Sequence, residues 1–203
     1  MREIIKLGTW DGEMLEWLVV AEDDSSRTLL SRRIIKNMPF SPDSNKHYDE
    51  SDIRTFLNGE FYDTAFSDSE KSEMLDTTVE MTMLHTYFGS FGTYGSGGSV
   101  NVRPPLSDKV YIPSPYEVKN VYALTPEEIA AFGGEKLWLR MLFTSGRPSL
   151  LSTAKDILSG ASPYFYVSES YNPMTDTFTS SDVPHSDYSS RPHAVAPVIR
   201  IKR

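Results

Sequence analysis

The chain has 203 residues, of which 39% are hydrophobic and 24% charged, and 20 Lys and Arg against 28 Asp and Glu give a formal net charge of -8. That length and composition predict one globular domain over residues 1–203. The negative charge disfavours phosphate backbones and anionic lipid surfaces, so we expect no nucleic-acid binding. The absence of cysteine excludes disulfides, thiolate metal sites and a cysteine nucleophile.

The first third of the chain has the pattern of an antiparallel meander. Apolar, β-prone runs at 4–10, 15–21 and 28–35 are separated by turn signals at Asp11-Gly12 and at 23–26. This regular spacing predicts three antiparallel strands.

Two helix signals come next, after a break that contains Pro39 and Pro42. Four apolar residues then recur at helical spacing on one face, which predicts a helix. They are Ile53, Phe56, Leu57 and Phe61. A capping box formed by Ser67 and Glu70 predicts a second, short helix directly afterwards.

Residues 86–105 combine Gly with Phe and Tyr, in the run TYFGSFGTYGSGGS and the residues after it. We predict a long Gly/aromatic loop with aromatic anchors. Neither the GxxxxGK[ST] pattern nor a GxGxxG between a strand and a helix is present, so a phosphate-binding loop is not indicated.

The second half resumes with a helix and three strands. Thr125 and Glu128 as a capping box, Pro126 at the first helical position and Gly133-Gly134 as the stop predict a helix ending near Phe132. Alternation predicts a core strand over 136–143. Two further strands are predicted at 164–168 and 194–201, so the polar run 168–193 between them is expected to be a long loop anchored at both ends.

Arg140 lies in the middle of the apolar strand segment WLRML. An unpaired buried charge is costly, so this side chain must reach solvent or a partner. We expect Arg140 to tie strands or loops together through a carboxylate or backbone carbonyls, with ligand binding as the alternative. Trp138, on the same face of the strand, is assigned a structural role as well.

Catalytic and metal-binding patterns are missing from the sequence. The four histidines lie in none of the GxSxG, HExxH or HxxxH patterns. His185 and His193 lie close in sequence to Asp182 and Asp187, but their spacing matches no zinc site and the EF-hand spacing is absent. We therefore predict no catalytic residue, no metal and no cofactor, and the chain is not expected to be an enzyme.

Six segments together resemble a bacterial and phage family of domains of unknown function. They are EWLVV, TLLSRRII, SDIRTFLNGEFYDTAFSDSEKSEML, SDKVYIPSPYEV, LWLR and APVIRI. The block 51–70 carries the most specific motif, (S/D)-x-x-R-x-(W/F)-LN-x-x-F, in which Arg54 is assigned a structural role. The chain departs from the family pattern at 141–143, where Ser-Pro-Gly is usual, and at 195–198, where an arginine is missing.

That family is similar to the C-type-lectin-like fold that sulfatase-modifying factors also use. The resemblance implies an α+β domain whose N- and C-terminal strands pair and whose long loops before the last strand form a binding face. It implies no catalysis, because the enzymatic relatives depend on cysteines or a histidine triad that this chain lacks.

The expected function is recognition of a glycan or protein ligand by the polar loop 168–193. Tyrosine with short polar side chains is typical of recognition loops. The candidate ligand-binding residues are Tyr171, Asn172, Asp176, Phe178, Asp182, His185, Asp187, Tyr188 and His193. The alternative is a structural subunit of a phage virion or another large assembly, in which the aromatic loop contacts a neighbouring copy as a homo-oligomer.

The sequence has neither an apolar signal-peptide region near Met1 nor a run of roughly 18 to 20 apolar residues that could span a bilayer. We therefore expect no membrane insertion, and a cytoplasmic or virion-associated location.

Overall fold

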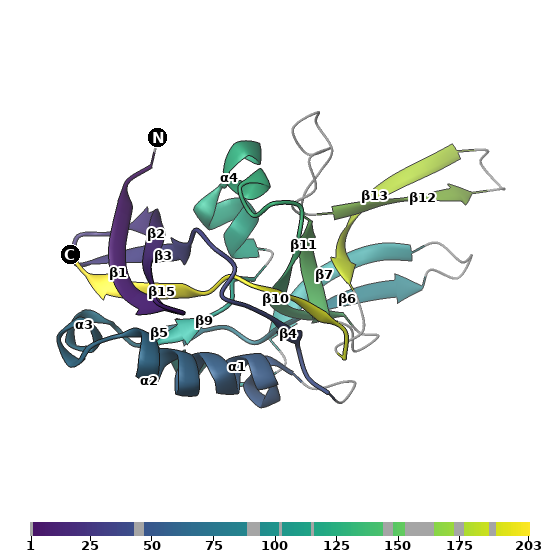
Figure 1. The fold of residues 1–203 in the computed structure, drawn as a ribbon. Helices are drawn as coiled ribbons and strands as arrows, with labels where there is room; N and C mark the ends of the chain where they lie inside the picture. Colours follow the sequence, from purple (N-terminus) through teal and green to yellow (C-terminus); the bar gives the residue numbers. More distant parts are fainter. Residues whose placement is uncertain are drawn as a thin grey trace.

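The computed structural model describes residues 2–42, 47–88, 94–101, 103–114, 116–143, 148–152, 165–172, 177–186 and 190–203. For the strands at 82–88, 94–101, 148–152, 165–172 and 177–186 the description covers the backbone pairing. The fold is mixed α+β, with mostly antiparallel sheets and a few short helices, as the sequence predicted. Figure 1 shows both chain ends at one end of an elongated molecule.

A five-stranded antiparallel sheet forms the end of the molecule that carries the termini. Its order is β1 (Ile4–Trp10), β2 (Glu13–Glu22), β3 (Ser26–Ser31), β15 (Val198–Lys202) and β9 (Val110–Tyr111). The three strands predicted from the first third are therefore present, although the third ends at Ser31. The C-terminal strand pairs with β3 and not with β1, which lies at the sheet edge.

The second sheet is built around β10 (Lys136–Phe143), the strand predicted from the alternation in KLWLRMLF. Its order is β12 (Phe165–Asn172), β13 (Thr177–Ser186), β11 (Pro148–Ser152), β10, β14 (Pro192–Val195) and β4 (Lys36–Pro39). The strand β6 (Thr82–Phe88) pairs in parallel with β10 and antiparallel with β7 (Tyr94–Asn101). A separate pair joins β5 (Thr77–Val79) and β8 (Leu106–Asp108).

The closing segment differs from the single strand predicted over 194–201. It forms β14 in one sheet and β15 in the other, with Ala196 and Pro197 between them. A proline has no amide hydrogen to donate to a ladder, so the segment can change sheets there. The carbonyls of Val195 and Pro197 accept from Ile35 and Ser31, which explains why β4, expected to be irregular, pairs with β14.

One face of the five-stranded sheet is covered by helical segments, namely η1 (Tyr48–Glu50), α1 (Asp52–Phe56), the π-helical turn η2 (Leu57–Phe61), α2 (Tyr62–Ala65) and α3 (Asp68–Glu73). All four residues of the predicted helix face, Ile53, Phe56, Leu57 and Phe61, are buried. Trp10 contacts Phe61 at a ring distance of 5.1 Å, and Trp17 is fully buried against Phe66. The Ser67–Glu70 capping box starts α3 as predicted.

The opposite face carries the turn η3 (Glu117–Tyr122) and α4 (Pro126–Ala130). Thr125 and Glu128 form the predicted capping box, with Pro126 in the first turn. Gly133 and Gly134 follow with φ of 77° and 91°, a conformation that disfavours any other residue and ends the helix.

Asp23 fastens the turn between β2 and β3 to the last strand. Its carboxylate accepts from the backbone amide and hydroxyl of Ser25 at 2.9 Å, from Ser26, and from Arg200 at 2.6 Å. These donors, with the Ser25 amide first, lower the pKa of Asp23 below its ordinary value.

We expect Asp23→Asn to lower the melting temperature at neutral pH and to have a shrinking effect in acid. A lowered folded-state pKa stabilises the fold above the unfolded carboxyl pKa of about 3.9, and this stabilisation is lost as the pH falls through the folded value. Thermal melts from pH 7 to acid should show the two proteins converging. Asp24→Asn is the control, because Asp24 accepts no hydrogen bond from the described residues; an equal effect there would contradict the assignment.

Candidate functional site

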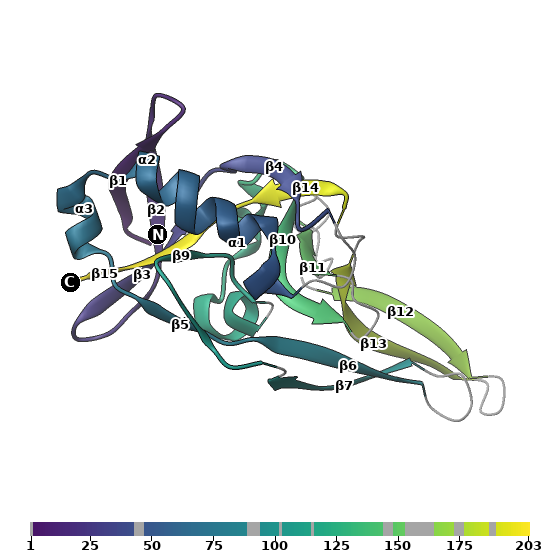
Figure 2. The same ribbon diagram turned by 90° about the horizontal axis from the view of Figure 1, so that it is seen from below.

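Two β-hairpins extend from the second sheet at the end opposite the termini. The β6–β7 ladder runs from Thr82↔Asn101 to Phe88↔Tyr94, and the β12–β13 ladder runs from Phe165↔Pro184 to Asn172↔Thr177. Figures 1 and 2 both show the two hairpins pointing the same way, beyond the helices and the five-stranded sheet. The strands β13 and β7 also contact each other, so the hairpins form one projecting end.

These hairpins correct two predictions. The Gly/aromatic segment 86–105 and the polar segment 168–193 were expected to be irregular loops, yet their described residues lie mostly in strands. Backbone groups pair in a ladder whatever the side chains are, and a hairpin that extends beyond the core needs no apolar alternation. The β-prone Tyr, Val, Thr and Phe residues of 165–172 and 177–183 were the signal that could have identified the second hairpin.

The structure brings together five of the nine predicted ligand-binding residues on the β12–β13 hairpin. Tyr171 and Asn172 end β12, and Phe178, Asp182 and His185 lie in β13. Tyr171 pairs directly with Phe178, one register position from the last pair. Three further candidates, Asp176, Asp187 and Tyr188, lie outside the described residues.

His193 is separated from this group. It lies in β14 opposite Met38 of β4, and its ring packs edge-on against Trp138 at 4.8 Å. Trp138 is fully buried, contacts Phe40 at 5.5 Å and donates its indole N–H to the Met38 carbonyl at 2.9 Å. These contacts join β10, β14 and β4, so His193 belongs to the scaffold of the second sheet.

Arg140 fixes β10, the strand to which both hairpins connect. Only 3% of its side chain is exposed, and it forms a two-point ion pair with Glu117 at 2.5 and 2.7 Å. The guanidinium also donates to the carbonyls of Ile112, at 2.9 Å, and Glu80, at 3.2 Å. Arg140 therefore has both kinds of partner that the sequence analysis named, a carboxylate and backbone carbonyls.

Two buried tyrosines complete this cluster. The hydroxyls of Tyr111 and Tyr122 lie 3.5 Å apart, and the Arg140 guanidinium lies 5.6 Å from the Tyr111 ring centre. Burial, with a smaller contribution from Glu117, raises the pKa of Tyr111 to about 12. Both hydroxyls therefore stay protonated at neutral pH, and Glu117 is the ionised partner of Arg140 among the described side chains.

Arg54 plays a related role between the helices and β8–β9. Its guanidinium pairs with the buried carboxylate of Asp108 at 2.7 Å. One helical turn later, the Asn58 amide donates to the Val110 carbonyl at 2.8 Å and its oxygen accepts from the Lys109 and Val110 amides. Arg54 and Asn58, which both lie in the motif block 51–70, therefore attach the helical face to β8 and β9.

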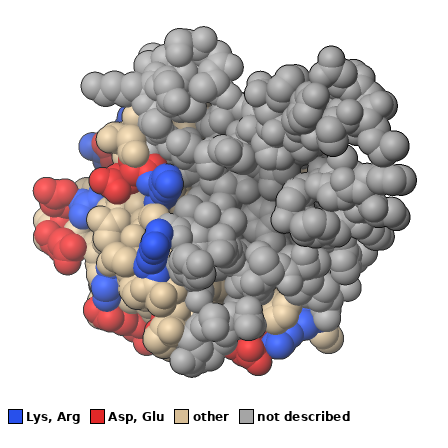
Figure 3. Space-filling view, turned by 90° about the vertical axis from the view of Figure 1, so that its right-hand side faces the viewer, with Lys and Arg blue, Asp and Glu red and all other residues tan. Residues whose placement is uncertain are grey.

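The remaining histidines and the charges offer no constellation for chemistry within the described residues. His47 is half-buried, and burial, followed by the nearby Arg103, lowers its pKa, so it is neutral at physiological pH. Among the described residues, no group of three or more His, Asp or Glu is placed to hold a metal ion. Figure 3 views the molecule from the hairpin side, and the described residues visible there carry both acidic and basic side chains.

The fold is therefore mixed α+β, and the two hairpins project from one end of it. Residues 25–146 match the family described as a domain of unknown function, DUF6273, and since this is more than half of the chain, the chain belongs to that family. No match was found among curated proteins or among solved structures. The matched residues run from the β2–β3 turn past β10, so the β12–β13 hairpin lies beyond them.

Among the described residues, no helix is both long enough and apolar enough to cross a bilayer.

Proposed function

We propose that this domain is a non-enzymatic recognition module of the C-type-lectin-like class, which binds a glycan or protein ligand through the end formed by β6–β7 and β12–β13. The observation that carries the proposal is the joint projection of the two hairpins, away from the core and from both termini (Figures 1 and 2). Loops and ends held by a rigid scaffold are where binding residues concentrate.

The strand β10 that supports this end is held in place by buried polar contacts. Arg140 and Trp138 are buried in β10 and connect it to the segment 112–117 and to β4. The strand β10 in turn pairs with β6 and with β11, which pairs with β13. A ligand that contacts both hairpins would thus meet a surface whose geometry is set before binding, which reduces the entropic cost of association.

The proposed contact residues are those of the β12–β13 hairpin and its flanks. Tyr171 and Phe178 supply aromatic area, while Asn172, Asp182 and His185 supply hydrogen-bonding groups. Asp176, Asp187 and Tyr188 stay predictions for the same surface. The proposal assigns no catalytic residue and no cofactor, and it expects neither nucleic acid nor a membrane as partner.

We expect the double variant Tyr171→Ala/Phe178→Ala to weaken ligand binding by about 2 kcal/mol or more, because buried aromatic anchors carry most of the energy of such contacts. The free energy of unfolding should change by less than about 0.5 kcal/mol, since the pair lies near the tip of the hairpin. Binding would be measured on glycan arrays with the protein labelled at its C-terminus, which lies far from the hairpins.

The matched control is Ser170→Ala/Thr179→Ala, the adjacent pair of the same ladder, which should bind like the unmodified chain. Equal losses in both variants would mean that the hairpin is merely destabilised, and would count against a specific contact surface. If the protein instead forms an obligate oligomer and binds no glycan, the alternative of an assembly subunit replaces the recognition function.

A further inference from the structure

A row of paired residues crosses the five-stranded sheet on the side of α4. Its members are Ile4, Leu18, Leu30, Val198 and Tyr111, each directly opposite the next in the register. Residues directly opposite each other in an antiparallel sheet share one face. Leu30, Val198 and Tyr111 are buried, whereas Ile4 is 40% exposed. The elements packed on this face therefore leave the sheet uncovered near its β1 edge.

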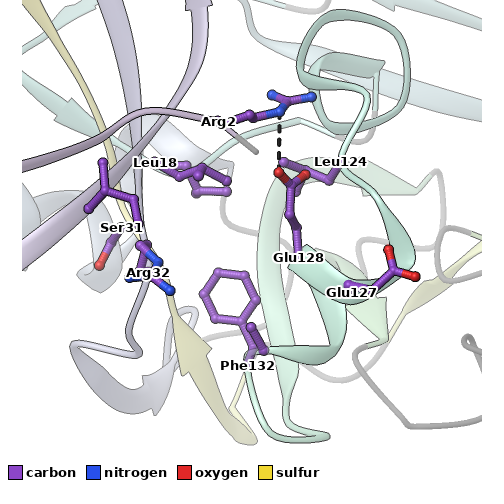
Figure 4. Close-up of a pocket in the computed structure, with 11 residues that line it drawn as sticks. Arg2, Leu18, Ser31, Arg32, Leu124, Glu127, Glu128 and Phe132 are labelled. Atoms are coloured by element: carbon purple, nitrogen blue, oxygen red, sulfur yellow. Dashed lines mark ion pairs between the residues drawn. The ribbon is translucent and has the colours of Figure 1, made fainter.

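A pocket of about 240 Å³ lies over the open part of that row. Leu18 and Leu30 line it from the sheet, and Leu124, Ala131 and Phe132 line it from α4 and the segments on either side of it. Figure 4 shows Leu18 and Arg32 on one side, Leu124 and Glu128 on the other, and Phe132 closing the end away from Arg2. The interior is therefore apolar, and charged groups stand at its margin.

Both arginines at the margin already have a carboxylate partner. Arg2 pairs with Glu128 at 3.3 Å, drawn as the dashed line in Figure 4, and donates to the carbonyls of Val20, Tyr122 and Ala123. Arg32 pairs with Glu16 at 2.6 Å. The lining thus contains two cations, Arg2 and Arg32, against two anions, Glu127 and Glu128.

The equal numbers of positive and negative side chains in the lining disfavour a charged ligand. A carboxylate entering the pocket would compete with Glu16 or Glu128 for an arginine, and an ammonium group would have to leave water for a mainly apolar interior. The volume of the pocket disfavours a large ligand, since pockets for drug-sized ligands span about 300–1,000 Å³. A protein partner would also have to desolvate the charged margin, because a standard interface covers about 800 Å² per partner.

We propose that this pocket binds a small uncharged apolar molecule, of the size of a bicyclic aromatic or a branched aliphatic chain. The site is separate from the hairpin end and does not depend on the recognition function. It is assembled from β1 to β3 and α4, which come from the two halves of the chain.

The test uses indole with its charged analogues tryptamine and indole-3-acetate, titrated into the full chain and followed by amide chemical shifts. We expect saturable binding of indole in the millimolar range, with the largest shifts in β2, β3 and α4. The two charged analogues should bind more weakly. No saturable shift with indole, or tighter binding of either analogue, would overturn the proposal.

Ala131→Phe provides the matching variant. Ala131 is exposed, follows α4 and lines the pocket, so a phenyl group there should fill it and abolish indole binding. Met14→Phe places the same side chain at another exposed position outside the pocket and should leave binding unchanged. Undiminished indole binding by Ala131→Phe would refute the site, and the shift map of the unmodified chain decides the question even if that variant folds poorly.

Discussion

Glu117→Gln is expected to lower the free energy of unfolding by about 3 kcal/mol, because it removes the one carboxylate that pairs with the buried Arg140 guanidinium among the described residues. The side chain of Arg140 is only 3% exposed, and the carbonyls of Ile112 and Glu80 cannot neutralise it. In addition, the Ser114 amide donates to the same carboxylate at 2.7 Å. In the glutamine variant, only one of the two acceptor oxygens remains. Urea denaturation followed by circular dichroism would measure the change.

The control for this experiment is Glu13→Gln. Glu13 pairs with Arg33 at 2.5 Å, the same distance as in the Arg140 pair, but 75% of the Glu13 side chain is exposed. Exposed ion pairs contribute little, so this variant should lose less than about 1 kcal/mol. Comparable losses in the two variants would show that burial does not decide the strength of the Arg140 pair.

Gly8→Ala in β1 is expected to lower the free energy of unfolding by about 3 kcal/mol. Gly8 has φ of 77°, where a Cβ costs about 1–2 kcal/mol. The added atom would also lie 2.8 Å from the Ala65 carbonyl oxygen and from the Phe66 ring, and overpacking adds about 1–3 kcal/mol. Gly8 also donates its amide to Glu70 at 2.8 Å, so this position joins β1 to the helical face.

Gly12→Ala separates the two causes. Gly12 has nearly the same φ, 78°, yet nothing lies within 4 Å of an added Cβ. We expect a loss of about 1 kcal/mol from the backbone conformation alone. Urea denaturation of both variants would measure the difference, and equal losses would mean that the approach of Phe66 to β1 is unimportant.

Local signals predicted much of the scaffold. Periodicity and the spacing of residues three or four positions apart are local properties that a sequence shows directly. They predicted the strands of the first third, the face of α1 and η2, both capping boxes and β10. Arg140 was identified for a similar reason, since a charge inside an apolar strand demands a partner. The sequence could not say that Glu117 would be that partner, because the two residues come from different elements.

The candidate site was predicted less well. The residues of 168–193 were selected as a contact surface, but they were placed in one loop, whereas the structure divides the described ones between a hairpin and β14. The pocket beside α4 had no sequence signal at all. Arg2, Leu18 and Phe132 become neighbours only when the meander and α4 pack together.

The sequence by itself determined the positions of the local elements and the absence of thiol chemistry, because these follow from residue types and short-range spacing, and its resemblance to a family implied the α+β class. Only the tertiary structure decided which strands pair, how the last segment divides between two sheets at Pro197, and where concave surface remains. Pairing and cavity formation depend on residues far apart in the chain, whose contacts are chosen by the packing of the whole core and leave no periodic trace in any one segment.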